Sequence, residues 1–125
     1  MSDIKIEIDK ARDLTIHTIT GKTSPEEIIS TLEGFYDNPT KHLLWDFSQA
    51  DVSGITGDDL KHILSAADKY ANRRPQGKTA ILATSDLPFG LGRQYSILGE
   101  LHESPVHIEP FRSYDMAIKW LLGNN

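Results

Sequence analysis

The sequence predicts an α/β fold with a mostly parallel five-stranded sheet, an N-terminal β-hairpin and about four helices. Two short runs with strand chemistry come first and are joined by a short polar link. Helical segments with one apolar face then alternate with short apolar segments as far as the C-terminus. Strands that alternate with helices form parallel sheets through right-handed crossovers, so this order predicts one sheet covered by helices.

The N-terminal hairpin is predicted over residues 4–19. Residues 4–8 alternate isoleucine with charged side chains, which is the pattern of a half-buried strand. Residues 14–19 are rich in β-branched side chains. The polar link 9–13 is short, and a short link between two such strands favours an antiparallel pair.

The first helix is predicted to begin at Ser24. This serine is followed by Pro25 in the first helical position and by Glu27 in the position of a capping-box glutamate. The apolar face of the helix contains Ile28, Leu32, Phe35 and Tyr36. Residues 37–39 end the helix, and the nearly continuous apolar run 42–47 predicts a strand that is covered on both faces.

The second helix is predicted to begin near Thr56, after a loop over residues 48–55. Its buried stripe contains Leu60, Ile63, Leu64, Ala67 and Ala71. The basic pair Arg73-Arg74 lies at the end of this helix, where such a pair is expected to face solvent and to complement the helix dipole.

The last elements follow the same alternation. Residues 79–83 predict a second buried strand, and residues 87–90 lead into a third helix. Residues 106–108 predict a short last strand closed by Pro110, and Ser113 is the expected cap of a C-terminal helix. The third helix carries Leu91, Tyr95, Leu98 and Leu101, and the C-terminal helix is expected to turn Met116, Ala117, Trp120 and Leu121 inward.

Composition restricts the possible functions. The 125 residues fit a single domain over residues 1–125, and the absence of cysteine excludes disulfides, zinc-thiolate sites and thiol nucleophiles. No apolar run approaches the roughly 18 residues needed to span a bilayer. The N-terminus has no signal-peptide pattern, so the cytoplasm is the expected compartment. A formal net charge of -5 disfavours binding to nucleic acid.

Metal binding is not expected from the histidines. His102 and His107 are five residues apart with Pro105 between them, whereas a zinc helix needs its histidines at i and i+4. The others are scattered over different elements, where a surface or hairpin position explains each of them. These are His17, His42 and His62. No metal or other cofactor is therefore predicted.

The stretch 90–93 is the candidate ligand site. It follows the strand 79–83 at the carboxyl end of the predicted sheet, where open α/β folds place ligands. Backbone N–H groups at Gly90 and Gly92, together with the Arg93 guanidinium, could hold an anion there. The stretch matches neither the P-loop nor the dinucleotide fingerprint. In the alternative interpretation the glycines only allow a tight turn and close helix packing.

An enzyme is the least favoured interpretation. Asp46, Asp51, Asp58, Asp59 and Asp86 fall near predicted strand ends and helix starts, where two of them could act as an acid–base pair. Aspartate at a helix start is more commonly a cap, and Asp58 and Asp59 fit that role. No serine stands in a nucleophile elbow.

The order of elements, with residues 44–48 (Leu-Trp-Asp-Phe-Ser) running to Thr56-Gly57, resembles the SpoIIAA-like, or STAS, family. This family includes anti-anti-sigma factors and the cytoplasmic domains of sulfate transporters. Residues 77–82, 89–93 and 117–121 resemble the small bacterial proteins labelled STAS/SEC14-like. The resemblance covers essentially the whole chain and implies a βα superhelix that binds partners or ligands without catalysis.

In the anti-anti-sigma branch of that family, a serine in an Asp-Ser-Ser-Gly motif opens the second helix and is phosphorylated by a partner kinase. In this chain residues 54–57 (Gly-Ile-Thr-Gly) occupy that position, and only Thr56 offers a hydroxyl. The resemblance therefore makes Thr56 the candidate regulatory phosphoacceptor. The residues alone predict an N-cap that accepts a hydrogen bond from the backbone near Asp59.

The sequence thus predicts a non-catalytic STAS-like interaction or regulatory module. The alternative is a protein that binds a small anionic or lipid-like ligand near the turn after strand 79–83. The expected partner is another protein, a small ligand or a second copy of the chain.

Overall fold

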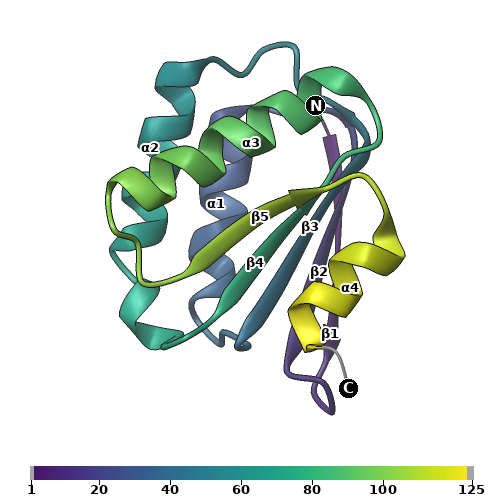
Figure 1. Cartoon of the computed structure of the whole chain (residues 1–125). Helices are drawn as coiled ribbons and strands as arrows, with labels where there is room; N and C mark the ends of the chain where they lie inside the picture. Colours follow the sequence, from purple (N-terminus) through teal and green to yellow (C-terminus); the bar gives the residue numbers. More distant parts are fainter. Residues whose placement is uncertain (1, 124–125) are drawn as a thin grey trace.

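The computed structural model describes residues 2–123, which contain five strands and four α-helices (Figure 1). The strands are β1 (Ser2–Asp9), β2 (Leu14–Lys22), β3 (His42–Asp51), β4 (Lys78–Leu82) and β5 (His107–Phe111). The helices are α1 (Pro25–Phe35), α2 (Gly57–Asp68), α3 (Asp86–Leu101) and α4 (Tyr114–Leu122), and the 3₁₀ turn η1 (Ala71–Arg73) follows α2.

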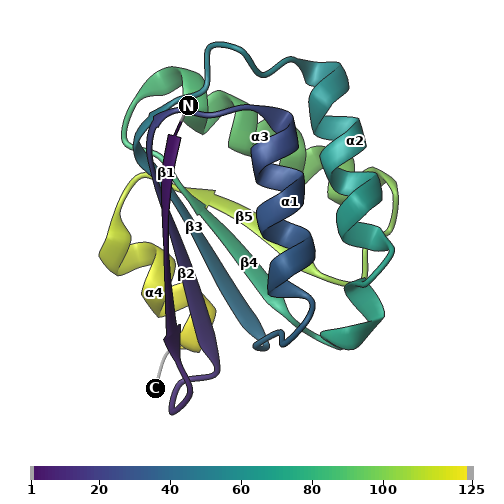
Figure 2. The same cartoon turned by 180° about the vertical axis from the view of Figure 1, so that it is seen from behind.

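The strands form one sheet in the order β1-β2-β3-β4-β5. β1 pairs antiparallel with β2, and each later pair of neighbours is parallel. The predicted sheet with an N-terminal hairpin is therefore confirmed. Each crossover adds its strand on the same side of the preceding one, so crossovers of one hand place α1, α2 and α3 on one face. α4 lies on the other face (Figures 1 and 2).

α1 begins where the sequence predicts. The Ser24 hydroxyl accepts a hydrogen bond from the backbone N–H of Glu27 at 3.2 Å, and Pro25 occupies the first helical position. Ile28, Leu32 and Phe35 are buried, as their spacing predicts.

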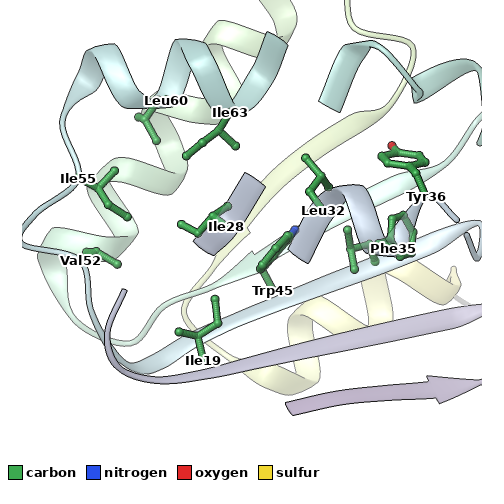
Figure 3. Close-up of a cluster of buried hydrophobic side chains, with 11 residues drawn as sticks. Ile19, Ile28, Leu32, Phe35, Tyr36, Trp45, Val52, Ile55, Leu60 and Ile63 are labelled. Carbon is green, nitrogen blue, oxygen red and sulfur yellow. The ribbon is translucent and has the colours of Figure 1, made fainter. Parts of the chain in front are cut away.

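Buried apolar side chains form one cluster on each face of the sheet. The larger cluster joins α1, α2 and the β3–α2 connection to β2 and β3, and Figure 3 shows its side chains. The smaller cluster lies under α4. Leu43 and Trp45 of β3 belong to the larger cluster and Leu44 to the smaller one, because successive side chains of a strand point to opposite faces. The prediction that this strand is covered on both faces is confirmed.

Four strands, β1, β2, β3 and β5, are longer than the sequence predicts. β3 continues to Asp51, because residues 49–51 still pair with residues 20–22 of β2 beyond a register shift. β5 continues through Pro110 to Phe111. β5 is an edge strand, and an edge strand tolerates a proline whose missing N–H would face away from its neighbour.

α4 differs from prediction at one position. Ala117 and Leu121 are buried against the sheet, as predicted, but Met116 is exposed. Adjacent residues lie about 100° apart around a helix, so the orientation that buries Ala117 turns Met116 outward. Within residues 2–123, no helix is both long and apolar enough to cross a bilayer.

Candidate functional site

A cavity of about 80 Å³ lies between the sheet and helices α1, α2 and α3. Its wall is mostly apolar and combines side chains from all three helices with side chains of β3 and β4. The lining includes Leu32, Trp45, Leu60, Ile63, Ile81 and Leu91. Figure 3 shows several of these side chains converging from α1, α2 and β3.

The cavity follows from the unequal distances of the helices from the sheet. α3 packs closely, because a Cβ atom at Gly92 would lie 3.1 Å from Ile81 Cγ2 and one at Gly99 would lie 3.0 Å from Ile108 Cδ1. α2 instead rests against α1 and α3. Large side chains such as Trp45 fill most of the space below α2, and the remainder is the cavity.

A few polar groups interrupt the apolar wall of the cavity. Burial raises the pKa of Tyr95, so its phenol is neutral. Ser104 donates its hydroxyl hydrogen to Asp68 Oδ1 at 3.2 Å. Because most of the lining is apolar, the cavity favours apolar atoms.

Arg74 also lines the cavity and is 3% exposed, which corrects the expectation that it faces solvent. Its Nη2 donates to the backbone carbonyls of Lys41 at 2.9 Å and of Lys78 at 2.8 Å. Its Nη1 donates to Thr79 Oγ1 at 3.1 Å. These bonds join the segment after α2 to the starts of β3 and β4. Arg73, in contrast, is exposed as expected.

His17 of β2 is buried on the same face of the sheet. Its ring lies 4.5 Å from the Trp45 ring and 5.9 Å from the Phe35 ring, centroid to centroid. Within residues 2–123 neither ring nitrogen has a hydrogen-bond partner. Burial, with a smaller contribution from the charge of Arg74, lowers the pKa of His17 to about 4. His17 is on the hairpin, as expected, but it is a neutral core residue there.

The predicted ligand residues Gly90, Gly92 and Arg93 lie inside α3, and not in a turn before it. The helix begins at Asp86, so residues 87–90 belong to the helix and do not only lead into it, as the sequence suggested. The backbone N–H of Phe89 already donates to the Ser85 carbonyl at 3.2 Å, so the N–H groups that follow belong to the helix.

The three residues differ in burial. Gly92 is buried against Ile81, which confirms the close-packing interpretation for that glycine. Gly90 and Arg93 are exposed. The assignment of the three residues to ligand binding stays a prediction.

Three large apolar side chains of α3 face solvent. Leu87, Ile97 and Leu101 are 55%, 52% and 73% exposed. With Gly90 and Gln94, both exposed, they follow the spacing i, i+3, i+7, i+10 and i+14, which places all five on one stripe of the helix. Apart from its chain neighbours and the backbone of its own helix, no atom of residues 2–123 lies within 4 Å of a Cβ built at Gly90, so the stripe is open at that point. We call these five residues the α3 outer face.

Thr56 caps α2. Its hydroxyl accepts a hydrogen bond from the backbone N–H of Asp59 at 3.2 Å, and the Asp59 carboxylate accepts one from the backbone N–H of Thr56 at 2.8 Å. The predicted cap is confirmed as a complete capping box. The hydroxyl is exposed at the surface, and its role as a phosphoacceptor stays a prediction.

The cap predicts how substitutions at Thr56 affect stability. Thr56→Val is expected to lower the free energy of unfolding by about 0.5–2 kcal/mol, because the backbone N–H of Asp59 loses its acceptor. Thr56→Asp is expected to be nearly neutral, because aspartate caps as well as threonine, while Asp58 and Asp59 repel the added charge. Urea denaturation of both variants measures the difference, and equal losses would contradict the cap. Phosphopeptide mass spectrometry of protein from its native cells tests the regulatory role.

Acidic side chains near the strand ends have local partners. Asp46 accepts hydrogen bonds from the backbone N–H of Ser48 at 2.9 Å and from its hydroxyl at 2.6 Å. Asp86 pairs with Arg112 at 3.0 Å. Across residues 2–123, no group of three or more histidine, cysteine, aspartate and glutamate side chains is placed to hold a metal ion.

Sequence reasoning missed the polar wall of the cavity. Arg74 carries no signal of burial, because a basic pair before a proline is typical of an exposed helix end. Tyr95 was placed correctly on the third helix, but nothing in the spacing of residues shows that the helices leave a space beside it.

No protein-family model matches the sequence, and no curated protein is similar to it in sequence. One similar solved structure is an uncharacterised protein of the DUF3478 family with a SpoIIAA-like fold from Shewanella loihica PV-4. It has a TM-score of 0.59 and 20% identity, and the alignment covers 97% of this chain and 95% of that chain. Another is an anti-sigma factor antagonist from Mycobacterium paratuberculosis, with a TM-score of 0.61, 13% identity and coverage of 97% and 94%. Because both alignments span nearly all of both chains, the chain has the SpoIIAA-like fold.

Proposed function

We propose that this chain is a non-catalytic interaction module that binds a partner protein through the α3 outer face. The observation that carries this proposal is the row of exposed Leu87, Ile97 and Leu101 on one helix. Ile97 and Leu101 are one helical turn apart, and adjacent exposed apolar side chains are typical of a surface that another molecule covers. The whole chain, residues 1–125, would act as one domain, in the reducing cytoplasm that a cysteine-free sequence suits.

The spacing of the α3 outer face fits an amphipathic helix of the partner. Apolar positions separated alternately by three and four residues form the seam along which two helices pack. Gly90, which presents no side chain, leaves room in this seam for a large side chain of the partner. One solved structure of the same fold is described as an anti-sigma factor antagonist, a role that is defined by its effect on another protein.

The acidic groups support binding over catalysis. Asp59 completes the capping box of α2, and Asp86 forms an ion pair with Arg112. Both side chains thus have roles at the start of a helix, which is the common use of aspartate there.

The proposal is tested by native mass spectrometry of protein purified from its own cells. The wild-type 14.0 kDa chain is expected to carry a partner protein, and Ile97→Asp/Leu101→Asp is expected to lose it. Glu33→Lys/Lys119→Asp, which changes exposed residues on α1 and α4, is the control and should keep the partner. A partner that stays bound to Ile97→Asp/Leu101→Asp would contradict this use of α3.

The cavity favours a second function, the binding of a small apolar ligand. Its volume of about 80 Å³ limits the size of the ligand. An engineered apolar cavity of about 150 Å³ accepts benzene, so this cavity accepts only a ligand of a few atoms. The function therefore ranks below partner binding.

Xenon is a suitable probe for the cavity. Xenon NMR is expected to show saturable binding to the wild type and none to Ala67→Leu, because Ala67 lines the cavity and leucine fills it. Ala66→Leu changes the adjacent residue of α2, which is not part of the lining, and should bind xenon as the wild type does. A wild-type protein that does not bind xenon would rule out this function.

A further inference from the structure

The two edges of the sheet differ in what they offer to another strand. β5 has five residues and includes Pro110, which has no N–H to donate. β1 has eight residues without proline or glycine, and within residues 2–123 it pairs only with β2. Every second residue of an edge strand directs its N–H and C=O away from the sheet. β1 therefore presents an unpaired row of hydrogen-bonding groups.

β1 also exposes apolar side chains beside that edge. Ile4, Ile6 and Ile8 share the face of the sheet that α1 covers, because side chains alternate along a strand. Ile4 packs against the core, whereas Ile6 and Ile8 are 56% and 53% exposed. A strand added at this edge would remove part of both side chains from water, which is favourable.

We propose that β1 pairs antiparallel with β1 of a second copy of this chain, about a two-fold axis at Ile6. In this register Ile6 lies opposite the second copy's Ile6, and Ile4 lies opposite its Ile8. The isoleucines of the two copies then form one continuous apolar row beside the two α1 helices. The two sheets join into a single sheet of ten strands, five from each copy.

The charges of Lys5 and Glu7, on the other face of β1, match in the same register. Lys5 and Glu7 lie side by side on one strand, with Lys5 Nζ 3.4 Å from Glu7 Oε1. Pairing about Ile6 places each Lys5 opposite a Glu7 of the other copy, so four charges alternate in sign. Opposite charges directly across two strands are favourable, and like charges are not. Asp3 lies opposite Asp9 of the other copy, a pair of like charges whose repulsion is offset by Arg12, 2.6 Å from Asp9.

Other registers are less favourable. An axis at Lys5 places the two Lys5 side chains opposite each other and each Asp3 opposite a Glu7, so each of these pairs brings like charges together. An axis at Glu7 pairs each Lys5 with an Asp9, but it places the two Glu7 side chains opposite each other and pairs only residues 5–9. An axis at Ile4 pairs only residues 2–6, and an axis at Ile8 pairs only the last residues of the strand. Charge therefore excludes the axis at Lys5, and paired length favours the axis at Ile6 over the others.

Charge reversal tests the interface in the full chain. Light scattering after size exclusion is expected to give the wild type twice the 14.0 kDa chain mass. Lys5→Glu and Glu7→Lys each place like charges across the axis and are expected to raise the dimer Kd about tenfold or more. The double exchange Lys5→Glu/Glu7→Lys restores opposite charges and should restore the dimer. Lys119→Glu, at an exposed position of α4, is the control that should leave the mass unchanged.

A single introduced cysteine tests the register. The chain has no cysteine of its own, so Ile6→Cys is expected to form a disulfide-linked dimer on oxidation, because the two residues at position 6 face each other across the axis. Ile8→Cys is expected to stay unlinked, because two residues at position 8 are separated by four residue steps, about 13 Å along the strand.

Some results would overturn the proposal. A monomeric wild type would show that the charged side chains of β1 keep its free edge from pairing with another strand. A dimer that resists both single reversals, or that cross-links at position 8 as readily as at position 6, would place the interface elsewhere. Thermal unfolding of each variant separates loss of the dimer from loss of the fold, because residues 5 to 8 are exposed.

Discussion

Replacing Arg74 with methionine is expected to lower the free energy of unfolding by about 3–5 kcal/mol. Methionine fills part of the space but donates no hydrogen bond. The hydroxyl of Thr79, which is buried, and the partly buried backbone carbonyls of Lys41 and Lys78 would then lose their donor. Each buried acceptor left without a partner costs about 1–3 kcal/mol, which is why this substitution has the largest expected effect. Chemical denaturation measures it.

The neighbouring residue provides a matched control. Arg73 is exposed and donates to the carbonyl of Tyr36 at 2.9 Å. Arg73→Met is expected to lower the free energy of unfolding by less than about 1 kcal/mol, because water can replace the lost donor at an exposed site. Similar losses for Arg73→Met and Arg74→Met would show that Arg74 does not hold β3 and β4 as the structure places it.

His17 is expected to make the fold sensitive to acid. Its pKa in the folded protein is about 4, below the ordinary value of 6.5, so the unfolded chain binds the proton more tightly. The contribution of the neutral ring is fully present above pH 6.5 and is lost as the pH falls toward 4. The two pKa values differ by about 2.5, which corresponds to about 3 kcal/mol. Denaturation at a series of pH values between these limits measures the loss.

Substitution assigns the acid sensitivity to His17. His17→Phe places a neutral ring between Phe35 and Trp45 and is expected to make the free energy of unfolding less dependent on pH. Part of the dependence should remain, because burial also lowers the pKa of His42. The exposed His62 on α2 serves as the control, and His62→Gln should retain the dependence on His17. An unchanged slope in His17→Phe would mean that this histidine is not buried as the structure shows.

The order of elements could be predicted from the sequence because local bonds mark the helix starts. The hydroxyls of Ser24, Thr56 and Ser113 each accept a hydrogen bond from the backbone N–H three residues later. Such caps are interactions between near neighbours, so they can be recognised without knowledge of the rest of the fold.

The start of α3 could not be predicted in this way. Pro88 and Gly90 are typical of a turn, yet they lie in the first turns of the helix. Pro88 is the third helical residue, where the absent N–H would have no partner within the helix. The helix forms because Gly92 and Gly99 let it pack closely on β4 and β5, a contact between distant parts of the chain.

The α3 outer face was missed for a related reason. Apolar spacing is normally used to find the buried face of a helix. In α3 the residues against the sheet are Pro88, Gly92, Ser96 and Gly99, whereas Ile97 and Leu101 face solvent. Small residues give close approach to the sheet, and Leu91, Tyr95 and Leu98 pack against the core beside them. The exposed apolar side chains lie on the α3 outer face. Only the positions of β4 and β5 distinguish these two faces.

Site-specific photocross-linking in native cells tests the central claim, that a partner protein binds the α3 outer face. A photoreactive residue at position 97 is compared with the same residue at Glu33 on α1 and Lys119 on α4, which are both exposed. The account predicts one discrete cross-linked protein at position 97, lost when Leu101 is replaced by aspartate, and none at positions 33 and 119. The absence of a product at position 97, or the same product at all three positions, would contradict it.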